Sequence, residues 1–223
     1  MPYQERHMKL HTTKLHTTIH TARLGAAEFK VIRPARTPVR ALLVDDPWYV
    51  NGWFDREAAR ITAGLWALAA TSPRALVHLP LRANAASAGE PQDTGVRRPL
   101  DLVLLHHSLQ FAPSRWKELR GRLGPGRPRT VDLPRPGPDA RPYASGRHHR
   151  ENRDRFRQDV HGETLFMTGS ARTFREAAGE FAELARTDPG REFNHGGRHY
   201  CRSVDCHPAD RDLHIVHREE WPA

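Results

Sequence analysis

The sequence predicts an α+β fold, with α/β as the alternative: a single layered domain in which a mixed sheet packs against about three helices. Short apolar runs typical of strands alternate with amphipathic stretches typical of helices, and this order favours layers around one sheet. The chain has 223 residues, enough for one large domain or two small ones. Its last two strand-like runs are separated by a short turn, which indicates a closing antiparallel hairpin and favours α+β.

Strands are expected where apolar, β-branched and aromatic residues cluster between turn residues. The segment "KLHTTKLHTTIHT" is rich in threonine and histidine, which favours extended chain over helix. Pro34 ends the second run, and Pro80 places the fourth at a sheet edge or a strand end, because proline donates no backbone hydrogen bond. In chain order, the expected strands are residues 9–21, 28–34, 39–47, 74–82, 100–107, 130–133, 162–170, 197–206 and 212–221.

Three segments have the apolar spacing of helices. In the clearest one, Ile61, Leu65 and Leu68 recur at intervals that place them on one helix face. Each segment contains or follows a side chain able to accept a hydrogen bond from the first turn. The three helices are residues 54–73 with Asp55 as N-cap, 114–124 with Ser114, and 171–187 with Ser170.

The chain divides into four segments by composition. We expect a basic extended N-terminal segment (1–27) and a first α/β portion (28–123). Residues 158–223 form a C-terminal β-α-β-β portion of the same domain. Between these portions, residues 124–157 are rich in Pro, Gly and Arg and too long for a routine connection, so they indicate a functional loop or an insert.

Positive charge is concentrated in two parts of the chain, whose formal net charge is +9. Residues 1–40 carry +6 and residues 124–157 carry +5, whereas residues 41–123 carry +2 and residues 158–223 carry −4. Basic arms on a near-neutral scaffold are typical of proteins that follow a phosphate backbone. The sequence therefore predicts a bacterial or phage accessory protein that binds nucleic acid non-specifically through basic loops.

The expected phosphate contacts lie in residues 124–157. Arginine and histidine donate hydrogen bonds to phosphate oxygens, and Phe156 is a candidate for stacking on a base. The predicted nucleic-acid-binding residues are Arg127, Arg129, Arg147, His148, His149, Arg150, Arg153 and Arg155.

The segment "NHGGRHYCRSVDCHPADRDLHIVHRE" (194–219) contains both cysteines and five of the 15 histidines. A zinc site needs about four nitrogen or sulfur ligands that converge. In a strand, alternation places Cys201 and Cys206 on opposite faces, which scatters the ligands. We therefore predict no metal, with Cys206 buried beside Val204, Leu213 and Ile215. The candidate ligands of the alternative, a local metal site, are His195, His199 and Cys201.

Two strand ends carry side chains suited to catalysis. Asp45 and Asp46 follow one strand, and two carboxylates there are able to hold Mg²⁺ or act as an acid/base pair. His106 and His107 end another strand, and sites in α/β proteins often lie at such ends. An enzyme that uses these four residues is a further alternative.

Several classes of protein lack support in the sequence. No window approaches the ~18 apolar residues of a membrane-spanning helix. The first residues have no apolar core of a secretory signal, and two cysteines do not make a disulfide framework, so a cytoplasmic location is expected. No P-loop, G-x-G-x-x-G, C-x2-C or HExxH motif occurs, and we expect no cofactor.

The order of elements in residues 162–219 offers a second function. A strand with "TGS", an amphipathic helix, a strand with "RHYC" and the final strand "DLHIVHRE" follow one another. This pattern resembles small bacterial immunity-type domains, which neutralise a partner toxin. The resemblance implies a protein-binding module of immunity or anti-host type.

Overall fold

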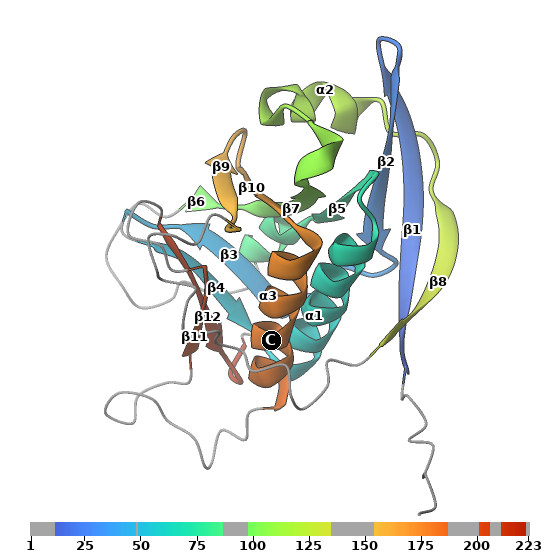
Figure 1. Cartoon of the computed structure of the whole chain (residues 1–223). Coiled ribbons are helices and arrows are strands. Elements are labelled where there is room, and N and C mark those ends of the chain that lie inside the picture. Colours follow the sequence, from blue (N-terminus) through green and yellow to red (C-terminus); the bar gives the residue numbers. More distant parts are fainter. Residues whose placement is uncertain are drawn as a thin grey trace, which may run out of the picture.

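The computed structural model has an α+β fold, as the sequence predicts, with its strands divided between two sheets (Figure 1). The structure describes residues 12–47, 49–86, 98–134, 154–186, 201–205 and 211–221. Within these residues there are twelve strands, three α-helices and three short 3₁₀ turns.

The large sheet has seven strands in the order β8-β1-β2-β5-β7-β10-β9. Its strand pairs are mixed: β2 is parallel to β5 and β7 is parallel to β10, whereas the other neighbours are antiparallel. In chain order its strands are β1 (Thr12–Leu24), β2 (Ala27–Pro34), β5 (Ala75–Leu79), β7 (Asp101–His106), β8 (Arg127–Pro134), β9 (Arg157–Val160) and β10 (Thr164–Gly169).

The small sheet has five strands in the order β11-β12-β4-β3-β6. The expected closing hairpin is confirmed, because β11 and β12 are antiparallel, and β12 then pairs in parallel with β4. In chain order its strands are β3 (Ala41–Asp45), β4 (Tyr49–Phe54), β6 (Arg98–Pro99), β11 (Cys201–Asp205) and β12 (Asp212–His217).

Two long helices, α1 (Arg56–Thr71) and α3 (Ala171–Arg186), lie side by side and pack against both sheets (Figure 1). Their apolar faces share one core with the inner faces of the sheets. At its centre Trp66 contacts Phe174 and Phe181, with ring centroids 5.7 and 5.4 Å apart. The short helix α2 (Trp116–Gly121) covers the opposite face of the large sheet, where Trp116 and Leu119 are buried in a second apolar cluster.

The structure confirms two of the three predicted helix caps. Asp55 accepts a hydrogen bond from the Ala58 backbone N–H at 2.7 Å, and Ser170 accepts one from Thr173 at 3.2 Å. The cap predicted at Ser114 is wrong: this residue lies in the 3₁₀ turn η3 (Pro113–Arg115), and α2 begins only at Trp116 without a side-chain cap. The remaining 3₁₀ turns are η1 (Leu81–Ala86) and η2 (His107–Leu109).

β5 resolves the two alternatives that Pro80 left open. This strand lies between β2 and β7 in the interior of the large sheet and ends at Leu79. Pro80 therefore marks a strand end and not an edge strand. β4, β6 and β9 were not expected from the sequence.

Candidate functional site

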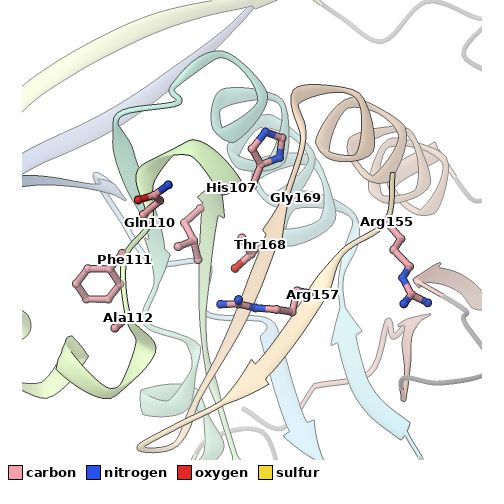
Figure 2. A pocket seen from close by; sticks show the side chains of 9 residues that line it. His107, Gln110, Phe111, Ala112, Arg155, Arg157, Thr168 and Gly169 are labelled. Atoms are coloured by element: carbon pink, nitrogen blue, oxygen red, sulfur yellow. The ribbon is translucent and has the colours of Figure 1, made fainter. Parts of the chain in front are cut away.

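An open pocket of about 420 Å³ lies where the parallel strands β7 and β10 end (Figure 2). Its floor includes the buried side chains of Leu105 and Phe111. Crevices beyond the carboxyl ends of parallel strands are frequent ligand sites, because the chain leaves the sheet there in diverging loops. The described residues that line it are Leu105, His107, Gln110, Phe111, Ala112, Arg155, Arg157, Thr168 and Gly169.

Strand register brings the polar groups of the pocket together. Thr168 of β10 lies between Leu105 of β7 and Arg157 of β9. In Figure 2 the Arg157 guanidinium reaches across toward Thr168, whereas Arg155 extends in another direction. His107 begins the turn η2 directly after β7, so its ring stands at the rim of the pocket.

Gly169 is required where β10 joins α3. A Cβ atom at this position would lie 2.5 Å from Cε1 of Phe156 and 2.6 Å from Oγ1 of Thr173. Real Cβ atoms do not approach other atoms so closely, so only glycine fits without a shift of the core. The N–H groups of Arg172 and Thr173 already donate to Ser170, so the pocket depends on side chains rather than on the end of α3.

The described lining is basic. It contains two arginines and a histidine, and among these described residues none is acidic. Arg157 also donates from Nε to Asp159 at 3.0 Å, which leaves its terminal amino groups for another acceptor. These groups are suited to bind an anion.

His106 and His107 are adjacent, but only His107 lines the pocket. Their ring centroids are 4.3 Å apart, and Nδ1 of His106 lies 2.8 Å from Oγ of Ser108. Partial burial, followed by the charge of His107, lowers the pKa of His106. His106 therefore shapes the turn after β7, and His107 is the exposed partner that lines the pocket.

Of the predicted nucleic-acid-binding residues, the structure places Arg155 in this pocket and two others far from it. Arg127 and Arg129 lie exposed on β8, the strand at the opposite edge of the large sheet. Six strand spacings of ~4.8 Å separate the two edges by about 29 Å. Arg147, His148, His149, Arg150 and Arg153 lie outside the described residues.

The expectation that Phe156 stacks on a base is wrong. Its side chain is buried in the main core, where its ring contacts Trp66 with centroids 5.4 Å apart. A ring held inside the core offers no face to a nucleotide. Phe156 instead holds the start of β9 against the helix pair.

The structure does not bring the two catalytic candidates together. Asp45 ends β3 in the small sheet and forms an ion pair with Arg211, which also donates to the backbone carbonyl of Asp46 at 3.0 Å. His106 and His107 lie at the far end of β7 in the large sheet. The Asp45 carboxylate is therefore engaged in holding the start of β12 beside the end of β3.

The described strands of the closing hairpin agree with part of the predicted arrangement, although a register shift between Ser203 and Asp205 places Asp205 opposite Leu213. Val204, Leu213 and Ile215 are all buried in the core, and Cys201 pairs with Val216 on the other face of the hairpin, where burial raises the pKa of its thiol. Among the described residues no three His, Cys, Asp or Glu side chains form a metal-binding group. His195, His199 and Cys206 lie outside the described residues.

Sequence reasoning missed a buried polar cluster beneath α2. His78, only 1% exposed, accepts a hydrogen bond at Nδ1 from Nε of Arg33 at 3.0 Å, and its Nε2 lies 3.6 Å from Oδ2 of Asp101. Such a His–Asp pair suggests a general base, but Nδ1 is occupied and the ring is closed to solvent. The cluster is therefore structural. The signal for it was a histidine within the apolar run "ALVHL".

Comparisons with known proteins add no identification: no protein-family model, curated protein or solved structure matches this chain. Fold and site define it as an α+β protein with a basic pocket at the ends of parallel strands. None of the described helices is long and apolar enough to cross a membrane.

Proposed function

We propose that the protein binds nucleic acid without sequence preference and that the pocket at the ends of β7 and β10 supplies phosphate contacts. One observation carries this proposal: Arg155, Arg157 and His107 line a single open pocket that has no acidic side chain among its described residues. Arginine forks match phosphate oxygens geometrically, and such contacts position a strand without reading its bases.

Two further features support the proposal. The pocket adjoins the end of the basic segment 124–157, and the whole chain carries a net charge of +9. The apolar residues at the floor of the pocket, Leu105 and Phe111, are buried and offer little surface to a ligand. Nucleic acid would therefore be bound mainly by the polar side chains at the rim. We also propose a cytoplasmic location, which is supported by the small number of cysteines in the chain.

The test is a salt titration of binding to a fluorescein-labelled duplex oligonucleotide, followed by anisotropy. Each phosphate contact contributes about −0.9 to the slope of log K against log salt. The double variant R155Q/R157Q should therefore reduce the magnitude of the slope by about two and weaken binding of unrelated sequences equally.

A matched control removes two other exposed arginines. R36Q/R186Q lowers the net charge by the same amount at positions that do not line the pocket. It should change the slope much less than R155Q/R157Q does. Absence of binding by the unmodified protein at about 50 mM salt contradicts nucleic-acid binding as a whole. If the two double variants reduce the slope equally, the result contradicts a role of the pocket in binding.

A further inference from the structure

The basic pocket is lined by one residue with an unfavourable backbone conformation. Gln110 follows the turn η2 with φ 51° and ψ 39°, in the left-handed region that glycine adopts freely and most other residues avoid. Glycine or asparagine normally occupies this place after a helical turn. Non-glycine residues held in this conformation cluster at ligand-binding and active sites, so the backbone of Gln110 points to a role of its side chain.

One other non-glycine residue among those described has a positive φ, and its side chain has a structural partner. Glu163, with φ 59°, lies between β9 and β10 and forms an ion pair with Arg82. The exposed amide of Gln110 has no hydrogen-bond partner among the described residues. The fold therefore accounts for the side chain of Glu163 but not for that of Gln110, which lines the pocket.

Hydrogen-bond donors reach the pocket from two sides. Figure 2 shows Gln110 on the side of the turn that follows β7 and Arg157 on the side of β9, with Thr168 of β10 between them in this view. The strand order β7-β10-β9 gives the same arrangement. The terminal amino groups of Arg157, the amide of Gln110 and the ring of His107 are able to donate, so they suit a ligand whose acceptor atoms point in several directions.

The phosphates of a nucleic-acid strand differ in the number of acceptor atoms that they offer. A phosphodiester inside the strand has two free oxygens and one negative charge. A phosphate at the end of a strand is a monoester, with three free oxygens and a charge of about −1.5 to −2 at pH 7. The guanidinium fork of Arg157 matches two oxygens, as it does in any phosphate. A donor on the other side of the pocket is needed only for the third oxygen.

We infer that the pocket binds the phosphorylated end of a nucleic-acid strand. This inference rests on the proposed function, because it concerns the same pocket, and it names the chemical group that the pocket prefers. Arg157 donates to two phosphate oxygens, and the Gln110 amide donates to the third. The cavity volume of about 420 Å³ lies within the range of small-ligand pockets, about 300–1,000 Å³, which leaves room for the phosphate and the sugar that carries it.

The experiment compares three forms of one short oligonucleotide by fluorescence anisotropy at about 50 mM salt. One form has a 5′-phosphate, one has a 3′-phosphate and the third has hydroxyl groups at both ends, with the fluorescein on an internal base. At least one phosphorylated form should bind the full chain about tenfold more tightly than the third form, because a hydrogen bond to a charged group contributes roughly this factor. Comparison of the two phosphorylated forms identifies the end that binds.

The variant Q110G tests the side of the pocket opposite Arg157. It removes the amide and keeps the arginines, so the preference for the phosphorylated form should fall from about tenfold to about twofold, with unchanged binding of the form that has no phosphate. Because glycine adopts the left-handed region without strain, Q110G should unfold at the same or a higher urea concentration than the unmodified protein. A loss of preference without a loss of stability is the result expected of a side chain that serves a ligand.

Glu163 supplies the matched control, because it shares the backbone conformation of Gln110 and does not line the pocket. E163G should keep the full preference for the phosphorylated form. Equal binding of the three forms, an equal loss of preference in Q110G and E163G, or a lower urea midpoint of Q110G overturns the terminal-phosphate site. Equal binding leaves the proposed function intact, whereas absence of binding by all three forms contradicts the proposed function and this inference together.

Discussion

At the scale of single residues, the buried cluster around His78 couples stability to pH. Burial, the strongest influence, lowers the pKa of His78 below 6.5 in the folded protein, and the charges of Arg33 and Arg120 act in the same direction. Burial alone would raise the pKa of Asp101, but the nearby His78 and the Arg82 backbone N–H lower it overall. Both lowered pKa values therefore make the folded state more stable at neutral pH than at acidic pH.

The sign of the pH dependence follows from these shifts. As pH falls below 6.5, the unfolded chain takes up a proton at His78 more readily than the folded one, so the free energy of unfolding decreases. We expect urea unfolding at pH 7 and pH 5.5 to show a smaller difference for H78Q than for the unmodified protein. H161Q, which removes an exposed histidine, is the control. An unchanged difference in H78Q contradicts the prediction.

At the scale of elements, the joint between β10 and α3 depends on Gly169. In G169A the new Cβ meets Phe156 and Thr173, so we expect a loss of about 1–3 kcal/mol in the free energy of unfolding. Gly121, at the end of α2, has nothing within 4 Å of an added Cβ, so G121A should be neutral or stabilising by up to about 1 kcal/mol. Chemical denaturation measures both, and equal effects would refute the steric argument.

Local pattern predicted the long elements well. The two long helices and their caps at Asp55 and Ser170 follow from apolar spacing and cap chemistry. In contrast, β4 was missed because "YVNGWF" has a central glycine and follows Asp46-Pro47, which favours a turn. β4 pairs with the preceding strand β3 and also with β12, more than 150 residues later, and no local pattern reports the second partner.

The pocket was not predicted from the sequence for the same reason, because it is formed by strands whose pairing no local pattern reports. His107 and Arg155 were selected for separate reasons, one as a strand-end catalyst and the other as a phosphate ligand. They line one pocket only because β7 pairs with β10 and β10 with β9. Arg157 belongs to the same basic segment but was not named among the predicted binding residues, and its side chain joins the pocket through the register of β9.

At the scale of the whole molecule, the shared core predicts cooperative unfolding. Trp66 and its neighbours on α1 and α3 pack against residues of both sheets, so neither sheet keeps its core if the other is lost. We expect the far-ultraviolet circular dichroism and the tryptophan fluorescence to change in one coincident transition with urea. Two separated transitions would indicate two independent units and contradict the single domain predicted from the sequence.

The stretch from β6 to β7 has a mechanical consequence for the molecule. Pro99 pairs with Val44, the Leu100 N–H donates to the carbonyl of Leu43 at 2.8 Å, and Asp101 then begins the strand that ends at the basic pocket. A single backbone segment is thus shared by the two sheets. Separation of the two sheets at this point would therefore require the backbone hydrogen bond between Leu100 and Leu43 to break.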